Sequence, residues 1–369
     1  MNRDSSNGLI TIFIPSFADE NNLNAQNLTT REIVARLSPD SFRVIMLSAG
    51  TLDARIAARK NTILLPQHNH GNTLWWLFRA LSYAPDVYFF PREGPLDSAF
   101  FLLRKFLHPP TSVVTYVVSG GLDTYAMPAA RARNIREADA VVANSAYISH
   151  VIRHQFGIES TTVYDGVDRR FFFPSPHLPI REASTVLYAG SFRKYKRVDL
   201  VVREAAKHSN VSFRFAGDGE ELQNCCGLAN ELGCKNVSFL GELSQSELGH
   251  EMRRADVFFF PSTLEGHPQV LLQAAACGLP VVAMNNYKPE YVIHNLTGLL
   301  SQTNEELSAN LSFLLENRDR RSAMGKAAIR HAVNFDWDQI AIQWANIFHR
   351  LVTQRHTVRT QDHKRFEYS

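Results

Sequence analysis

The sequence predicts an α/β fold of two Rossmann-like domains, each built on a doubly wound parallel sheet. Three observations lead to this prediction. The chain has 369 residues, too many for one ordinary core and suited to two domains of roughly 150 residues each. Short β-rich runs alternate with longer helical stretches in both halves. Several runs in the second half are almost entirely apolar, as in strands buried on both faces of a sheet.

The first predicted domain covers residues 1–170. Its expected strands, in chain order, are Leu9–Pro15, Phe42–Leu47, Asn61–Leu65, Asp86–Phe90, Ser112–Val118 and Ala138–Asn144. The turn Asp165-Gly166-Val167-Asp168 ends this domain, and the proline-punctuated residues 171–184 are predicted to form a linker. Asp165 and Asp168 are expected only to shape that turn.

The second predicted domain covers residues 185–335. Its expected strands are Thr185–Ala189, Val211–Ala216, Val237–Leu240, Asp256–Pro261 and Pro280–Met284. Residues 336–369 follow as an amphipathic helix from about Trp337 to about Leu351 and a polar tail that is predicted to be mobile. In open parallel sheets, ligands bind beyond the carboxyl ends of the strands, so the loops at those ends are expected to carry the binding and catalytic residues.

Composition excludes some classes of function. The 39 basic and 36 acidic residues give a formal net charge of +3, far from the basic surface of a dedicated nucleic-acid binder. The four cysteines show no pairing frame, and the chain opens on a polar run instead of a secretory signal, so a cytoplasmic location is expected. No apolar run reaches the roughly 18 residues of a membrane span. Phe100–Leu107, apolar and basic, is either a core helix or a peripheral membrane contact.

The loop after the fourth predicted strand of the second domain carries the strongest signal for a binding site. Pro268 suits the first position of the following helix, and Gly278 suits its left-handed C-terminal cap. Free N–H groups and the positive dipole end at the start of a helix attract anions. Glu265 lies just before the helix, and Gln269 and Gln273 lie four residues apart on one of its faces. A simple capping role is the alternative for Glu265.

Two further loops in this domain have suitable residues. Four cations follow the first strand: Arg193, Lys194, Lys196 and Arg197. Preorganised cations stabilise a leaving group on which negative charge develops, and a solvated charge run is the alternative interpretation. Gly217, after the second strand, and Gly219 would let the backbone approach a ligand closely.

Taken in order, these segments resemble the retaining glycosyltransferases of family 4, whose fold, called GT-B, has two Rossmann-like domains facing a central cleft. The matching segments are Ala138–Ser145, Asp165–Asp168, Tyr188–Gly190, Gly217–Gly219, Phe239–Gly241, the Glu265 loop, Thr297–Leu300 and Phe335–Trp337. The resemblance implies transfer of a hexose-type sugar from a nucleotide diphosphate sugar to an acceptor hydroxyl with retention of configuration. It places the reaction in glycan, glycolipid or glycoconjugate biosynthesis.

The resemblance also implies roles for single residues. Glu265 and Gln273 fall on the two glutamates that mark the family's donor site, so a glutamine replaces the second one. A glutamine can still accept from one ribose hydroxyl and donate to the other. Lys196 matches the phosphate-binding lysine, and Arg193 would compensate for Ser191, which stands where the family often has an arginine.

The candidate catalytic residues are therefore Glu265, Lys196 and Arg193. The candidate positions for binding the nucleotide sugar are Gly190, Ser191, Arg197, Gly217, Gly219, Gly241, Gly266, His267, Pro268, Gln269, Val270 and Gln273. His267 is expected to act through its backbone. The family further implies that the helix from Trp337 returns towards the first domain.

The first half departs from the family pattern at two places. Ser16–Asn22 stands where a glycine-rich loop usually follows the first strand, and Val118–Gly121 stands where a histidine is frequent. This side of the site is therefore left unassigned.

No metal or other cofactor is expected. Asp336-Trp337-Asp338 copies the DxD metal motif of another glycosyltransferase fold, but its place at the start of a helix favours a capping role. His68-Asn69-His70 lacks further ligands at metal spacing. No carboxylate nucleophile stands out, so the family's front-face mechanism is expected, in which the leaving phosphate helps to deprotonate the acceptor.

The expected partners are a nucleotide-sugar donor and a carbohydrate, lipid-linked or other hydroxyl acceptor, with weak contact at the inner face of a membrane and no nucleic acid. Two other functions stay open. A nucleotide-sugar 2-epimerase shares the fold but needs acid and base residues beside the sugar. A non-catalytic nucleotide-sugar binding protein would agree with Gln273 and with the missing histidine.

Overall fold

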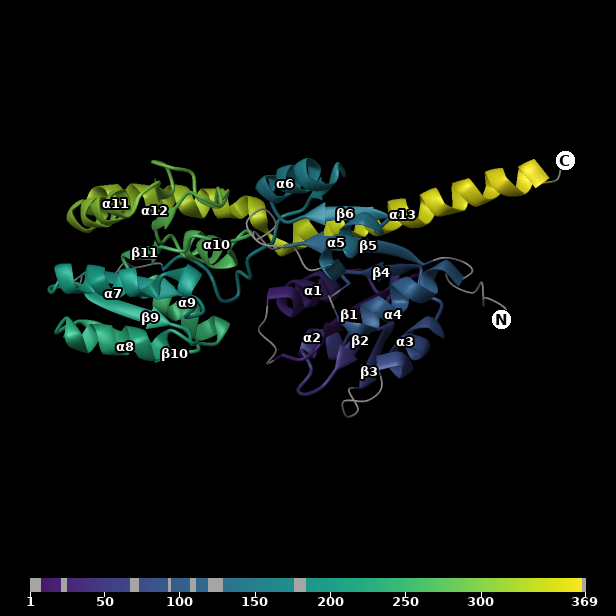
Figure 1. The fold of residues 1–369 in the computed structure, drawn as a ribbon, viewed down its shortest axis with the longest axis horizontal. Helices are drawn as coiled ribbons and strands as arrows, with labels where there is room; N and C mark the ends of the chain where they lie inside the picture. Colours follow the sequence, from purple (N-terminus) through teal and green to yellow (C-terminus); the bar gives the residue numbers. More distant parts are fainter. Residues whose placement is uncertain are drawn as a thin grey trace. The chain divides into compact units, whose positions relative to one another are not determined.

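The computed structural model describes residues 8–20, 25–66, 73–91, 94–106, 111–118, 129–175 and 184–366. The chain divides into two compact units (Figure 1). The first contains the described residues up to Asp165 together with the chain from Trp337 onward, and the second is Gly166–Asp336. Each unit has its own parallel sheet.

The sheet of the first unit has seven strands in the order β3-β2-β1-β4-β5-β6-β7, and all of its neighbours pair in parallel. The strands are β1 (Ile10–Phe17), β2 (Phe42–Ser48), β3 (Thr62–Pro66), β4 (Val87–Phe89), β5 (Ser112–Val117), β6 (Ala140–Ala143) and β7 (Thr161–Thr162). The order 3-2-1-4-5-6 is that of the doubly wound Rossmann sheet. This part of the fold prediction is confirmed.

Helices cover both faces of this sheet. They are α1 (Ala25–Arg36), α2 (Ala54–Ala57), α3 (Thr73–Leu81), α4 (Pro95–Leu103), η1 (Arg104–Phe106), α5 (Ala129–Arg136), α6 (Ala146–Phe156) and α13 (Trp337–Phe366). Alternation along β1 sends Ile12 into the core beneath α1 and α13, and Phe13 into the core beneath α3 and α4. Both side chains are fully buried.

Helix α13 belongs to the first unit and completes its core. It packs against α1 and β1, and Trp344 and Phe348 are fully buried beside Phe89. The sequence predicted that this helix ends at about Leu351, but it continues to Phe366. Neither proline nor glycine interrupts residues 337–366, so no residue forces the helix to end earlier.

The sheet of the second unit has six parallel strands in the order β10-β9-β8-β11-β12-β13. They are β8 (Thr185–Ala189), β9 (Ser212–Ala216), β10 (Val237–Gly241), β11 (Val257–Phe260), β12 (Val281–Met284) and β13 (Gly298–Ser301). The helices are η2 (Lys194–Lys196), α7 (Val198–Lys207), α8 (Leu222–Glu231), α9 (Gln245–Arg254), α10 (Gln269–Ala276), α11 (Asn304–Glu316), α12 (Arg318–Ala332) and η3 (Val333–Phe335). The order is again 3-2-1-4-5-6, so both units have the predicted Rossmann-like topology.

Candidate functional site

The switch point of the second sheet lies between β8 and β11. These two strands are neighbours, but β9 continues the sheet on one side and β12 on the other. Loops that leave the carboxyl ends of β8 and β11 therefore diverge, and the space between such loops is where open α/β sheets bind ligands. The two loops with the strongest sequence signals, at Arg193–Arg197 and at Glu265, are the loops at this point.

An ion pair joins the two loops. Lys196 Nζ lies 2.5 Å from Glu265 Oε1, and the two side chains are only 12% and 11% exposed. Ser262 donates a hydrogen bond to the same oxygen, also at 2.5 Å. The ammonium group lies 5.2 Å from the centre of the Phe260 ring, within the range of a cation–π contact. The structure thus brings together two of the three candidate catalytic residues.

Hydrogen bonds to the backbone of η2 link the two loops to each other. The carbonyl oxygen of Tyr195 accepts hydrogen bonds from the Thr263 N–H at 3.0 Å and the Thr263 hydroxyl at 3.2 Å. Neither Tyr195 nor Ser262 was a candidate from the sequence. The signal available was that Ser262 directly follows the strand end and lies three residues before Glu265.

The remaining candidate cations point elsewhere. Arg193 is exposed, and its side chain has no hydrogen bond or ion pair to the described parts of the chain, so it is open to a ligand. Arg197 has a left-handed backbone with φ +55°, and its guanidinium donates to the side chain of Asn304 at the start of α11. The structure does not bring Arg197 to the Lys196–Glu265 pair.

The glycines after β9 serve loop packing. Gly217 has φ +127°, and a Cβ atom there would overlap the carbonyl group of Gly190. At Gly219 a Cβ atom would lie 2.7 Å from the carbonyl oxygen of Phe192. The backbone of the loop after β8 thus fills the position that a Cβ atom would take at either glycine. Gly241 accepts a hydrogen bond from the Gly217 N–H at 2.7 Å.

The side chain of Tyr188 holds the backbone of the loop after β8 in place. Burial, with a smaller contribution from the charge of Glu265, raises the pKa of Tyr188 well above its ordinary value. Its hydroxyl therefore stays protonated and donates to the carbonyl oxygen of Ser191 at 3.0 Å. This hydrogen bond helps to hold the backbone at Ser191, directly after Gly190.

Helix α10 begins one residue later than predicted. Pro268 is its N-cap residue, with φ −68° and ψ 113°, so the first helical residues are Gln269 and Val270. Pro268 fixes the chain direction into the helix without being part of it. Gly278 has φ +74° just after the helix, as expected for a left-handed C-terminal cap.

Two of the predicted binding residues, Gln273 within α10 and His267 just before it, have different environments. The Gln273 Oε1 atom is buried and has no hydrogen-bond partner among the described residues. His267 is 5% exposed, and its ring lies 3.6 Å from that of Tyr291, centre to centre. That burial agrees with a backbone role for the His267–Pro268 segment. Gly266, beside it, is buried as well.

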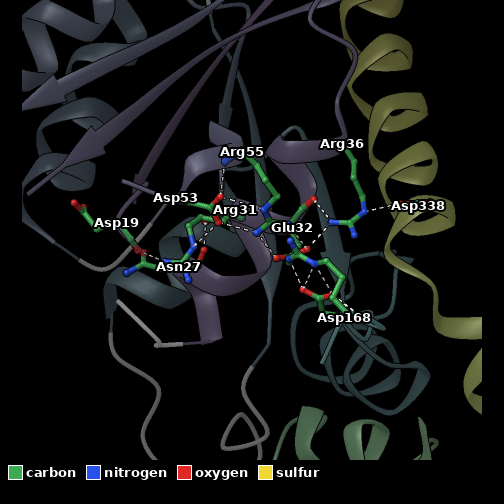
Figure 2. A network of polar contacts seen from close by, with 11 residues as sticks. Asp19, Asn27, Arg31, Glu32, Arg36, Asp53, Arg55, Asp168 and Asp338 are labelled. Carbon is green, nitrogen blue, oxygen red and sulfur yellow. Dashed lines mark hydrogen bonds and ion pairs between the residues drawn. The ribbon is translucent and has the colours of Figure 1, made fainter. Parts of the chain in front are cut away.

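The loop after the first strand of the first unit is held by charges. The Asp19 carboxylate accepts hydrogen bonds from the N–H groups of Ala49 and Gly50, which follow β2. Arg31 donates to the Asp19 carbonyl oxygen and lies 3.8 Å from Asp53 (Figure 2). Ser16 is fully buried. The predicted positions Asn21, Asn22, Ser119–Gly121 and His68–His70 lie outside the described residues.

Two acidic pairs differ in role. Asp165 does more than shape a turn, because its carboxylate accepts from Thr29 on α1 and from Asn144 after β6. Asp168 does shape its turn, accepting the Arg170 N–H at 3.0 Å.

Asp336 has an extended backbone directly before α13, and Asp338 pairs with Arg36 at 2.5 Å. Among the described residues, His, Cys, Asp and Glu form no group of three that could hold a metal.

Comparison with known families and proteins adds independent information on this region. Residues 172–331 match the model of a family described as glycosyl transferases group 1. An uncharacterized glycosyltransferase of Methanocaldococcus jannaschii is 23% identical over 216 residues, which are 58% of this chain and 60% of that protein. A D-inositol 3-phosphate glycosyltransferase of Mycobacterium bovis is 31% identical over 226 residues, 55% of this chain and 47% of that protein. The chain thus spans about half the length of these curated relatives.

Solved structures show the same fold over nearly the whole chain. Sucrose-phosphate synthase from Thermosynechococcus elongatus has a TM-score of 0.79 at 19% identity, covering 94% of this chain and 100% of that one. HepE of Anabaena in complex with UDP-glucose has a TM-score of 0.74 at 18% identity, covering 92% and 100%. The fold is therefore GT-B, as the sequence predicts.

Proposed function

We propose that the chain is a glycosyltransferase that moves a hexose-type sugar from a nucleotide diphosphate sugar to an acceptor hydroxyl, with retention of configuration and without a metal. The observation that carries the proposal is the Lys196–Glu265 pair at the β8/β11 switch point. The match of residues 172–331 to the group 1 family model supports it, since both loops lie within that range.

The proposed chemistry depends on charge at the leaving group. When the bond between sugar and diphosphate breaks, negative charge grows on the departing phosphate oxygen, and a cation fixed beside that oxygen lowers the barrier. Lys196 is fixed by Glu265, whose carboxylate also accepts a hydrogen bond from Ser262. Arg193, exposed in the same loop, supplies a second positive charge. The two cations take the place of a metal in this proposal.

The unpartnered Gln273 Oε1 supports a ribose-binding role at α10. A hydroxyl of the nucleotide's ribose would give this buried acceptor the donor that it lacks, which makes binding more favourable. Uridine diphosphate sugars are the first to test, because HepE has been solved with UDP-glucose. In the front-face step that we propose, the leaving phosphate takes the proton of the acceptor hydroxyl, so no enzyme nucleophile is required.

A lipid-linked acceptor at a membrane surface is part of the same proposal. None of the described helices has the length and apolar composition to cross a bilayer. The neighbouring helices α3, α4 and η1, however, expose Trp75, Phe78, Leu102 and Phe106 by 43%, 60%, 71% and 80%. Exposed aromatic and aliphatic side chains on neighbouring helices support such a contact, because large apolar surfaces often meet another apolar phase.

The test is turnover with a nucleotide sugar and a pool of acceptors, followed by mass spectrometry. We expect Lys196→Ala and Glu265→Ala each to lower transfer at least roughly a hundredfold, in the range reported for loss of one transition-state contact. Lys194→Ala is the matched control, because Lys194 lies in the same loop but is exposed. Activity with a chelator present should be unchanged. Full transfer by both site variants would disprove the assignment.

The same assay separates the alternatives. A 2-epimerase would convert the nucleotide sugar into an isomer when no acceptor is present, and a binding protein would be stabilised by the nucleotide sugar without turning it over. The relatives described as glycosyltransferases favour transfer over both.

A further inference from the structure

Tyr287 is a buried tyrosine in the loop after β12. Because β12 pairs with β11, this loop leaves the same edge of the sheet as the Glu265 loop. The Asn285 N–H donates to the Ser301 carbonyl oxygen at 2.9 Å, and the Lys288 N–H donates to the Asn285 carbonyl oxygen at 3.2 Å. This tight turn leaves Lys288 exposed but directs Tyr287 inward, where it is 3% exposed.

The Tyr287 hydroxyl has no hydrogen-bond partner within the described ranges of the chain. Other buried tyrosines are different. Tyr88 donates to Asp97 at 2.5 Å, and the Tyr116 and Tyr188 hydroxyls each donate to a backbone carbonyl at 3.0 Å. A buried hydroxyl that loses water without gaining a partner is unfavourable, so the exception calls for a missing partner.

Glu265 provides the chemical context of this hydroxyl. Burial is the main cause that raises the pKa of Tyr287 well above its ordinary value, and the nearby charge of Glu265 adds to the effect. The hydroxyl therefore stays protonated and can donate. Glu265 accepts from Lys196 and Ser262 at Oε1, whereas Oε2 accepts no hydrogen bond from the described residues.

We propose that Tyr287 positions the sugar of the nucleotide-sugar donor, a role that rests on the proposed function. One sugar hydroxyl accepts a hydrogen bond from Tyr287 and donates one to Glu265 Oε2. Only a group that both accepts and donates satisfies this pair, and a sugar hydroxyl is such a group. A phosphate fits poorly, because it repels the carboxylate and has no proton to donate to it.

The substitution Tyr287→Phe removes the hydroxyl and keeps the ring. We expect the Kd for UDP-glucose, or for whichever nucleotide sugar stabilises the wild type most, to rise roughly two- to tenfold. The Kd for the corresponding nucleoside diphosphate should not change, because that ligand lacks the transferred sugar and has only the ribose, which the proposed function assigns to Gln273. The Tm of the free protein should stay the same or rise, since an unsatisfied group is removed. Calorimetric titration and thermal unfolding of the full chain give these values.

Tyr88→Phe is the matched control, because the Tyr88 hydroxyl is bonded to Asp97 in the core of the first unit. It should lower the Tm and leave both Kd values unchanged. Wild-type affinity of Tyr287→Phe for the nucleotide sugar, or an equal loss for nucleotide sugar and nucleoside diphosphate, would overturn the proposal. If no nucleotide sugar binds the wild type, the proposed function itself fails, which is a distinguishable result.

Discussion

Gly217 shows how one missing side chain supports the candidate site. Its position in the left-handed half of conformational space, at φ +127°, is reserved largely for glycine, and the backbone of Gly190 fills the place of a side chain. The loops after β8 and β9 can therefore pack backbone to backbone. The loop after β8 carries Lys196, so this contact helps to fix the position of its ammonium group.

Gly217→Ala is expected to destabilise the protein by roughly 2–5 kcal/mol, since it combines backbone strain with a clash that only a backbone shift relieves. Urea unfolding measures this. Gly227→Ala is the control: Gly227 lies exposed within α8, and a Cβ atom there meets nothing within 4 Å. That change should stabilise by about 0.5–1 kcal/mol. Equal effects of the two substitutions would contradict the packing argument.

The sequence allowed part of the candidate site to be predicted at this scale. Glu265 and Lys196 were predictable because both follow strands whose carboxyl ends meet at one edge of the sheet. The contact of Arg197 with Asn304 was not predictable, because it depends on a left-handed backbone that no property of arginine indicates. Tyr287 was missed because only the three-dimensional turn shows that its side chain points inward while Lys288 is exposed.

At the scale of elements, a charge network ties α1 to α2 and α13. Arg55 donates to both Glu32 carboxylate oxygens, at 2.9 and 2.6 Å, and to Asp53 at 2.7 Å (Figure 2). Glu32 also pairs with Arg36, which reaches Asp338 on α13. The Glu32 side chain is 2% exposed, whereas that of Asp338 is 76% exposed. The buried ion pairs between α1 and α2 are therefore expected to contribute more to stability than the exposed pair with α13.

Arg55→Met should lower the free energy of unfolding by roughly 2–4 kcal/mol, because it removes the main partner of two buried carboxylates. The Arg55 side chain is 29% exposed, which makes the loss smaller than for a fully buried pair. Asp338→Ala, the control, should cost about 0–1 kcal/mol. Burial alone would raise the pKa of Asp53, but Arg55 outweighs it and the pKa lies below its ordinary value. A carboxylate whose pKa is lowered on folding stabilises the folded protein at pH values above its ordinary pKa. This stabilisation is lost as the pH falls through the pKa that the group has in the folded protein.

The pH dependence follows from that sign. In urea unfolding, the gap in stability between wild type and Arg55→Met should be fully present above about pH 5 and should narrow towards about pH 3. A gap that does not change with pH would show that Arg55 does not act through the charge of its carboxylate partners.

Element boundaries divide into those that the sequence determines and those that packing determines. The apolar run Thr185–Ala189 was predicted to the residue, because burial on both faces leaves little freedom. β7 and β13 were not predicted as strands, since Thr161–Thr162 is too short and Gly298 begins β13 with a residue that disfavours strands. The full length of α13 depends on the absence of helix breakers and was underestimated.

At the scale of the whole molecule, the exposed surface formed by α3, α4 and η1 determines how the protein meets a membrane in the proposed function. Phe78→Ser together with Phe106→Ser should reduce sedimentation with phosphatidylglycerol vesicles at least roughly tenfold, since each side chain would lose its transfer into the apolar phase. Phe313→Ser is the control, because Phe313 is 44% exposed on α11 of the second unit. Unchanged sedimentation of the double variant would refute the membrane contact, and a change in oligomeric state would instead indicate self-association.

The order of the chain also bears on its synthesis. The core of the first unit needs Trp344 and Phe348, which are translated only after the second unit, Gly166–Asp336, has been made. At 5–20 residues per second, the ribosome needs roughly 10–35 s for that stretch. The apolar face that Phe89 and Ile12 share with α13 is not covered by that helix during this time, so the amino-terminal half completes its core only after the second unit has been synthesised.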